Sequence, residues 1–238
     1  MDRPDYALKG FESQFEMAGR PNGDSGFTAL ELGPGDSLFS ALVVHAFGGR
    51  RCWLVDAGAF ADTDLSLYRQ MADYLKAQGL PAVDLSGVTS VSELLEASNA
   101  NYLTSGLTSL REIPDESVDF NWSRAVLEHI RRHEFRDTVQ ELRRILRPGG
   151  ACSHRVDLSD HLDGNLNNLR FSDRWWESEF MAKSGFYTNR IRFSEMLEHF
   201  SAAGFAVEVK RINRWDQLPT PKARMARRFR SIDDDELR

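Results

Sequence analysis

The stretch Ala29–Leu38, with the sequence ALELGPGDSL, constrains the fold of this chain more than any other. A short apolar run reaches Glu31, breaks at Gly33-Pro34-Gly35 and gives way to an apolar helical pattern. This order predicts a strand, a tight glycine turn and the start of a helix. Glycines suit a ligand site because a Cβ would hold the ligand away from the backbone, while the helix N-terminus offers unpaired N–H groups.

Strands and helices alternate along the rest of the chain. Further strands are expected at Arg51–Asp56, Tyr102–Leu103, Ser117–Ser123, Ala151–Leu158 and Phe205–Ile212. Helices are expected at Ser37–Phe47, Asp64–Gln78, Val91–Ala97, Glu134–Leu146 and Met196–Ala203. Such alternation predicts an α/β fold with a doubly wound, mostly parallel sheet and helices on both faces. In this architecture ligands bind at the carboxyl ends of the strands, near the switch in strand order.

The length and net charge of the chain exclude several classes of protein. The 238 residues fit a single domain, 1–238, and the net charge of −6 argues against a general nucleic-acid binder. No apolar run approaches the roughly 20 residues that span a bilayer, and the N-terminus lacks the apolar region of a signal peptide. Cys52 and Cys152 form no metal-binding or redox spacing. We expect two buried thiols in a reducing cytoplasm.

Asp56 is the first candidate ligand-binding side chain outside the glycine turn. It lies 21 positions after Gly35, at the end of the second predicted strand. A carboxylate there can accept hydrogen bonds from both hydroxyls of a ribose; the alternative is a solvated aspartate at a strand end. NAD fits less well, because the turn lacks the third glycine of GxGxxG and places Asp36 where a pyrophosphate would approach. The pattern favours a nucleoside ligand without phosphates.

Four sequence blocks carry a family resemblance: ELGPGDSL, VDAG, IPDESVDFNWSRAVLEHI and ELRRILRPGG. In this order, across roughly residues 27–158, they resemble the class I S-adenosylmethionine-dependent methyltransferases of the type 11 kind. The resemblance implies S-adenosylmethionine as cofactor. It further implies that Glu31 and the Gly33–Gly35 turn hold the methionine end of the cofactor, that Asp56 holds the ribose and that Ala57 lies against the adenine.

The resemblance also assigns cofactor residues after the third and fourth strands. The segment with Ser105, Gly106 and Leu107 lies where the family contacts adenine, although the aspartate common there is missing. Three residues at the end of the fourth strand are expected beside the reactive methyl group: Asn121, Ser123 and Arg124. The family ends on an antiparallel hairpin, of which only the strand at Phe205–Ile212 is found.

A cluster just after the fifth predicted strand offers candidates for the chemistry. Methyl transfer needs alignment of the nucleophile and, for a hydroxyl, removal of its proton. We expect the proton acceptor among His154, Asp157 and His161. The alternative is a packed strand histidine beside a surface or capping histidine. No metal site is predicted, because strand alternation places His154 and Asp157 on opposite faces.

The segment 159–190 is predicted to be an inserted lid over the mouth of the active site. It is rich in Asn, Arg and aromatic residues that could bind a sugar, a ring or a phosphate. Together with His129, the candidate acceptor-binding residues are Asn168, Arg170, Trp175, Trp176 and Tyr187. Alternatively, the lid is a helical segment that packs its own aromatics against the domain.

The C-terminal segment 213–238 is basic and then acidic. Its cationic part could make a weak contact with a membrane surface or hold a phosphorylated substrate. A solvated, partly disordered tail is the other interpretation.

Together these features predict a cytoplasmic methyltransferase, with O-methylation of a sugar or glycan intermediate as the leading hypothesis. A nitrogen acceptor or a small aromatic metabolite is the alternative within the enzyme class. A catalytically silent, cofactor-binding partner protein is the alternative outside it. The oligomeric state is not predicted.

Overall fold

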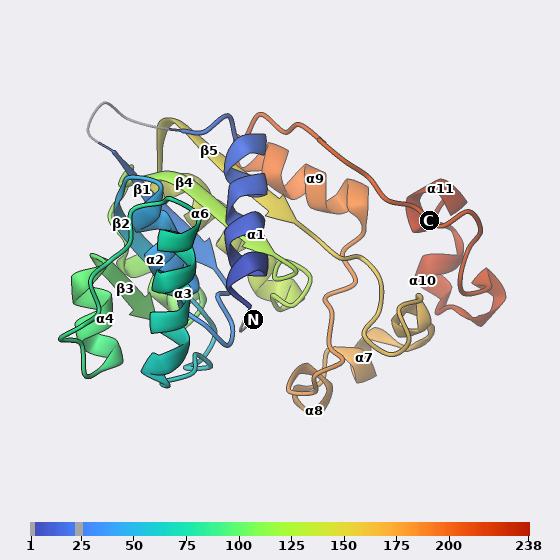
Figure 1. Cartoon of the computed structure of the whole chain (residues 1–238). Helices are drawn as coiled ribbons and strands as arrows, with labels where there is room; N and C mark the ends of the chain where they lie inside the picture. Colours follow the sequence, from blue (N-terminus) through green and yellow to red (C-terminus); the bar gives the residue numbers. More distant parts are fainter. Residues whose placement is uncertain (1–2, 22–25) are drawn as a thin grey trace. The chain divides into compact units, whose positions relative to one another are not determined.

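The computed structural model describes residues 3–21 and 26–238, and the chain forms two compact units. The first unit consists of the chain up to Arg124 together with Arg144–His154. The second consists of Ala125–Arg143 and Arg155–Arg238. Figure 1 shows their elements along the chain. The chain leaves the first unit after the fourth strand, returns for the fifth and then completes the second unit.

The sheet confirms the predicted fold class. Its strands are β1 Phe27–Leu32, β2 Gly49–Val55, β3 Ala100–Leu103, β4 Val118–Arg124 and β5 Leu146–Arg155, in the order β3-β2-β1-β4-β5. The pairs β1–β2, β1–β4 and β2–β3 are parallel. Strand order reverses between β1 and β4, so the loop after β1 lies at the position where doubly wound sheets bind ligands.

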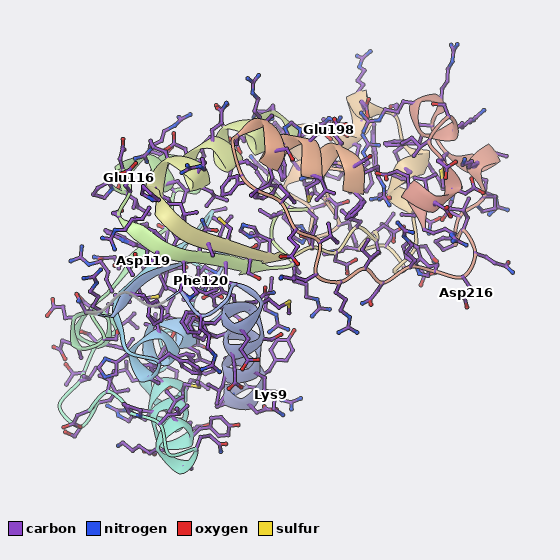
Figure 2. The ribbon with its side chains drawn as sticks, turned by 90° about the horizontal axis from the view of Figure 1, so that it is seen from above. Lys9, Glu116, Asp119, Phe120, Glu198 and Asp216 are labelled. Carbon is purple, nitrogen blue, oxygen red and sulfur yellow. The ribbon has the colours of Figure 1, made fainter. Side chains whose placement is uncertain are left out.

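Three helices of the first unit share its main apolar core. They are α1 Pro4–Met17, α2 Phe39–Ala46 and α3 Leu65–Ala77. Helix α1 has no counterpart among the predicted elements, although Leu8, Phe11 and Phe15 have helical spacing. The ring of Phe11 lies edge-on to Phe120 of β4 at 6.0 Å between centroids (Figure 2). The N-terminal helix is therefore part of the sheet's core.

Of the next three helices along the chain, the first and the last match predicted helices, whereas the middle one was not predicted. They are α4 Val91–Ala97, α5 Leu107–Glu112 and α6 Arg132–Ile145. Asp64 caps α3 by accepting the N–H of Ser66, and Ser90 caps α4 by accepting that of Glu93. Strand β5 begins and ends earlier than the predicted Ala151–Leu158, because it pairs from Leu146 onward.

The second unit is built from short helices. Besides most of α6 it contains η1 Asn167–Arg170, α7 Asp173–Trp176, α8 Glu179–Ala182, α9 Phe193–Ala202, η2 Lys222–Arg224, α10 Arg227–Arg230 and α11 Asp234–Leu237. The C-terminal segment is folded, because Met225, Phe229 and Leu237 are buried with Leu166 and Leu169. The interpretation of residues 213–238 as a solvated, partly disordered tail is wrong for this buried part of the segment.

The predicted strand at Phe205–Ile212 is also wrong. The segment has no regular secondary structure. Its side chains Val207, Val209 and Ile212 are 40%, 41% and 47% exposed. Alternation alone does not make a strand, because an extended segment needs a paired neighbour to satisfy its backbone groups. Among the described residues the sheet ends at β5.

Candidate functional site

The glycine turn after β1 has the backbone that its sequence predicts. Gly33 and Gly35 have φ angles of 72° and 70°, in the left-handed region that other L-residues rarely adopt. The N–H of Gly33 donates to the carbonyl of Val55 at 2.8 Å, which fixes the turn to the end of β2. A Cβ at Gly35 would meet no atom within 4 Å. The turn therefore leaves open space beside its backbone.

Asp56 connects the loops that follow three neighbouring strands. Its Oδ2 accepts the N–H of Gly35 at 2.9 Å, and its Oδ1 accepts the N–H of Ala57 at 2.7 Å. Its backbone carbonyl accepts the N–H of Gly106 at 2.8 Å. The carboxylate is nearly buried, at 9% exposure. The sequence-predicted residues around Asp56 are therefore brought together at the carboxyl ends of β1, β2 and β3.

The predicted adenine-contacting segment leads from β3 into α5. Gly106 has a φ angle of 53°, and its ideal Cβ position lies 3.8 Å from the Cα of Ala57. The N–H of Ser105 donates to the hydroxyl of Ser109 at 2.9 Å. Leu107 is the first residue of α5 and is partly buried. Ala57 and the Ser105–Leu107 segment thus lie side by side, as the resemblance implies.

Glu31 is a buried acid beside the glycine turn. Burial raises the pKa of Glu31 to about 8, and the negative charge of Asp56 adds to the shift, while a hydrogen bond with Ser40 and the charge of Arg124 oppose it. A small pocket reaches this carboxyl group and is also lined by Pro34 and Arg124. This pocket brings an acid and a cation together next to the turn.

Arg124 lies against the N-terminal helix. Its guanidinium stacks on the ring of Tyr6, 4.2 Å from the centroid. A Cβ added at Gly10 would overlap that guanidinium. A side chain at position 10 would force this guanidinium to move. Arg124 is therefore held at the pocket by a helix that the sequence reasoning missed.

Asn121, Ser123 and His154 form a polar group on β4 and β5. The hydroxyl of Ser123 and Nδ1 of His154 are 2.8 Å apart. Desolvation lowers the pKa of His154 to about 4, so its imidazole is neutral at pH 7. Asn121 is fully buried, and neither its Oδ1 nor its Nδ2 has a partner among the described residues. His154 is thus a partly buried histidine whose Nδ1 is paired with Ser123.

The other two predicted proton acceptors meet in the second unit, near His129. The rings of His129 and His161 are 4.7 Å apart between centroids. Nδ1 of His129 donates to the carbonyl of Tyr187 at 2.9 Å, since a carbonyl can only accept. Asp157 accepts the N–H and the hydroxyl of Ser159 at 2.9 and 2.7 Å. Burial opposes its charge, but these bonds and the charges of nearby cations hold the pKa of Asp157 below its usual value.

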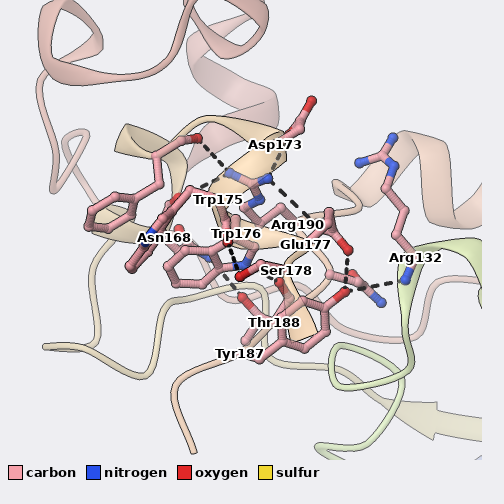
Figure 3. A network of polar contacts seen from close by, with 12 residues as sticks. Arg132, Asn168, Asp173, Trp175, Trp176, Glu177, Ser178, Tyr187, Thr188 and Arg190 are labelled. Carbon is pink, nitrogen blue, oxygen red and sulfur yellow. Dashed lines mark hydrogen bonds and ion pairs between the residues drawn. The ribbon is translucent and has the colours of Figure 1, made fainter. Parts of the chain in front are cut away.

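The predicted acceptor-binding aromatics differ in exposure. Trp176 is fully buried and donates from Nε1 to the carbonyl of Thr188 at 2.7 Å (Figure 3). Tyr187 is 3% exposed, and its hydroxyl donates to Glu177 at 2.8 Å. Trp175, by contrast, is 44% exposed. The lid buries Trp176 and Tyr187, whereas Trp175 and two further lid aromatics, Phe180 at 79% and Phe186 at 50% exposure, present their rings to solvent.

The two polar lid candidates also differ. Arg170 is exposed at the end of η1, whereas Asn168 is 1% exposed and donates from Nδ2 to the hydroxyl of Thr188 at 2.9 Å. Arg190 holds the lid from inside: its guanidinium is buried, pairs with Asp173 at 2.6 Å and stacks on Trp176. Its Nη1 also donates to the carbonyls of Asn168 and Phe171.

Glu128 is a site residue that the sequence reasoning missed. It is 1% exposed, and its Oε1 accepts the N–H of Asp157 at 3.1 Å. Burial raises the pKa of Glu128 to about 7 and Asp157 adds to the shift, while N–H bonds and Arg155 oppose it. The available signal was an acidic residue inside the apolar run AVLEHI.

Two further properties were checked in the described part of the chain. No group of three His, Cys, Asp or Glu side chains converges as a metal site would require. No helix within residues 3–21 and 26–238 has the length and apolarity to cross a bilayer. Both cysteines are free thiols.

A doubly wound sheet with a glycine turn after β1 and a carboxylate after β2 defines the class of nucleoside-binding α/β domains. Residues 66–153 match the family model described as a methyltransferase domain, of type 11. These residues are therefore similar to a methyltransferase domain. The match begins after β2, so the glycine turn and Asp56 lie outside it. No curated protein matches the chain.

Several solved structures are similar in fold. A chain of the complex between the Haloferax volcanii Trm112 methyltransferase activator and its methyltransferase is 20% identical, with a TM-score of 0.43 over 84% of this chain and 72% of that one. Haemonchus contortus phosphoethanolamine N-methyltransferase 2 with S-adenosyl-L-methionine is 15% identical, with a TM-score of 0.48 over 83% of this chain and 36% of that one. The DszA carbon methyltransferase is 14% identical, with a TM-score of 0.47 over 85% and 47%. The chain spans less than half the length of the last two.

Proposed function

We propose that this chain binds S-adenosylmethionine in its first unit and transfers the methyl group to a hydroxyl of a polar acceptor, with a sugar or glycan intermediate as the leading candidate. The observation that carries the cofactor part is the position of Asp56, which joins the loops after β1, β2 and β3. Its carboxylate can accept two charge-assisted hydrogen bonds from the hydroxyls of a ribose.

The residues present fit the cofactor. The space beside the Gly35 backbone is open, so a ligand can approach the turn closely. Asp56 would hold the ribose, Ala57 and Ser105–Leu107 would line the adenine, and Glu31 with the glycine turn would hold the methionine end. The pocket beside the turn supports the last assignment, because Glu31 and Arg124 can serve the amino and carboxylate groups of an amino acid.

S-adenosylmethionine supplies a methyl group on a sulfonium, which is already an excellent leaving group. The chain then has to align the acceptor and, for a hydroxyl, take its proton. We assign acceptor binding to the second unit, since its lid combines an exposed Trp175 with buried polar groups. A proton-accepting role for His154, Asp157 or His161 stays a prediction, as do acceptor contacts by His129, Asn168, Arg170, Trp176 and Tyr187.

A nitrogen acceptor or a small aromatic metabolite is the alternative within the enzyme class. Either would use the same alignment without needing the same proton acceptor.

The basic C-terminal segment makes ion pairs inside the second unit: Lys222 pairs with Asp234, and Arg228 pairs with Asp173 at 3.1 Å. Weak membrane contact through this segment and a cytoplasmic location stay predictions.

Two measurements test the proposal. Calorimetry should show that the full chain binds S-adenosylhomocysteine in the micromolar range, which corresponds to about 8 kcal/mol, and that it does not bind NADH. Transfer of a labelled methyl group should then be measured on a panel of glycosides, amines and phenols. Binding without transfer to any acceptor would favour the silent partner protein, and NADH binding alone would overturn the cofactor assignment.

A further inference from the structure

The second unit contains a polar pocket built around a buried acid. Glu128, Asp157, Ser159 and Asn168 line it. Glu128 and Asn168 are each 1% exposed, and Oε2 of Glu128 and Oδ1 of Asn168 have no hydrogen-bond partner among the described residues. Leaving a buried oxygen without a donor is costly, so a pocket lined by two such oxygens favours an occupant that brings donors.

Both buried side chains are held in place by their other atoms. Oε1 of Glu128 accepts the N–H of Asp157 at 3.1 Å, and the Glu128 carbonyl accepts the N–H of Asn189 at 2.7 Å. Nδ2 of Asn168 donates to Thr188 at 2.9 Å, in the network drawn in Figure 3. The unpartnered oxygens are therefore presented by a fixed frame of the kind that a binding site needs.

The charges around the pocket select against an anionic occupant. Glu128 and Asp157 both contribute carboxylates to it. Arg190 and Arg192 also line it. Both terminal nitrogens of Arg190 are committed, to Phe171 and Asp173, and Nη1 of Arg192 donates to the carbonyl of Leu158. A hydroxyl fits this surrounding better than a phosphate does, because a phosphate would meet two carboxylates.

We propose that this pocket binds a hydroxyl group of the methyl acceptor and that Glu128 accepts its proton during transfer. The acceptor oxygen forms a bond to the methyl carbon, the carbon–sulfur bond breaks with its electrons going to sulfur, and the hydroxyl proton goes to Oε2 of Glu128. Water removes that proton afterwards. This inference rests on the proposed function and adds to it the acceptor-binding group.

The position of Glu128 in the chain agrees with this role. It follows the end of β4 by four residues, and its partner Asp157 follows the end of β5 by two. Ligands of doubly wound sheets bind outside these carboxyl ends. The carboxyl group also has a suitable acidity, because a pKa of about 7 lets it be ionised before transfer and hold a proton afterwards. Asp157 and Arg155 are the charged groups that act on it.

The test follows the Glu128 carboxyl carbon by NMR in the full chain labelled at glutamate carboxyls, with S-adenosylhomocysteine present. Its signal is identified by its loss in Glu128→Gln. Glu198→Gln is the matched control, since Glu198 lies exposed on α9 of the same unit (Figure 2). We expect Glu128 to titrate near pH 7. Titration near the ordinary glutamate pKa of about 4.3 would overturn the proton-accepting role.

The occupant is tested with three probes at pH 8: a set of methyl glycosides, glycerol 1-phosphate and methylammonium. A methyl glycoside should shift the Glu128 signal and bind at least about tenfold more tightly than glycerol 1-phosphate. Glu128→Gln should weaken that binding about tenfold or more, as expected for a lost hydrogen bond to a charged group, and Glu198→Gln should not.

Three outcomes would contradict the inference: no shift from any glycoside, equal binding of the phosphate, or a shift from methylammonium alone. Calorimetry with S-adenosylhomocysteine separates this failure from that of the proposed function. Cofactor binding without a glycoside response rejects only the pocket assignment, whereas absent cofactor binding rejects the function on which it rests.

Discussion

The carboxylate of Asp56 accepts the backbone N–H of Gly35 at 2.9 Å, across 21 positions of sequence. This bond connects the loop after β1 to the loop after β2. One side chain therefore both shapes the glycine turn and offers its remaining lone pairs to a ligand. The relationship makes Asp56 the most direct residue with which to test the cofactor site.

Asp56→Ala should weaken binding of S-adenosylhomocysteine by ~1.5–3 kcal/mol, because charge-assisted hydrogen bonds to the ribose disappear. Isothermal calorimetry on both proteins measures the difference. Asp216→Ala, which removes an exposed carboxylate of the second unit, is the control and should bind as the wild type does. Equal affinity of Asp56→Ala and the wild type would contradict the ribose assignment.

Gly35→Val should abolish cofactor binding while the protein remains folded. The new side chain would occupy the open space beside the turn, and the φ angle of 70° would add strain of about 1–2 kcal/mol. Gly79→Val is a close match in backbone, since Gly79 has a φ angle of 75° and equally open surroundings after α3. Both variants should lose similar stability in urea, and only the first should lose binding. Loss of binding in both would point to strain instead of a blocked site.

Glu31→Gln should change how stability depends on pH. The pKa of Glu31 is raised to about 8 in the folded protein, so between about pH 4.5 and 8 the folded state binds more protons than the unfolded state. Stability therefore falls as pH rises through this window, by at most about 1.4 kcal/mol per pH unit for one proton. The variant should show a flatter dependence in urea titrations at pH 5, 6, 7 and 8. Parallel curves would show that Glu31 is ionised in the folded state.

Alanine variants of Trp175 and Trp176 should separate the effect on acceptor binding from the effect on core packing. Trp176→Ala should lower the unfolding free energy by about 3–5 kcal/mol, because the ring is fully buried. Trp175→Ala should leave stability nearly unchanged and raise the acceptor KM. If the exposed ring stacks on the acceptor, the increase should correspond to a loss of about 0.5–1.5 kcal/mol of binding free energy. Thermal unfolding and steady-state kinetics measure the two effects. An unchanged KM in Trp175→Ala would remove the main support for stacking by the lid.

Single variants can also distinguish the proton acceptors. Glu128→Gln should lower kcat by ~10²–10⁴, the range for a positioned proton acceptor, with cofactor affinity unchanged. Asp157→Asn and His161→Gln should each lower kcat by less than about tenfold. Asp157 and His161 act on Glu128 or on the lid and do not take the proton directly. A larger loss in either of them would restore the sequence-based assignment of the base.

The sequence predicted the sheet and the glycine turn beside Asp56 because both depend on local signals. Positive φ angles at Gly33 and Gly35 and a carboxylate after an apolar strand are readable from short stretches. The exposure of the lid residues could not be predicted from short stretches, since Trp175 and Trp176 are neighbours of the same type with opposite surroundings. Their difference arises from Arg190 and Thr188, which reach only Trp176.

Two other features depended on long-range packing. Glu128 became visible as a candidate only through its burial and its bond to Asp157, 29 positions later. The alternating segment Phe205–Ile212 resembled a strand, yet among the described residues no neighbouring strand pairs with it. Periodicity reports which side chains could share a face, and it cannot report whether a partner backbone is available.

The small core that joins Leu166 and Leu169 to Leu237 also sets an order of events during synthesis. Leu237 leaves the ribosome 68 residues after Leu169. At about 5–20 residues per second, the lid waits roughly 3–14 s for the residues that bury it. The strands of the sheet are all complete before that interval begins. A nascent chain can therefore carry all the strands of its sheet for seconds before this small core closes, and in that interval Leu166 and Leu169 are exposed to chaperones and proteases.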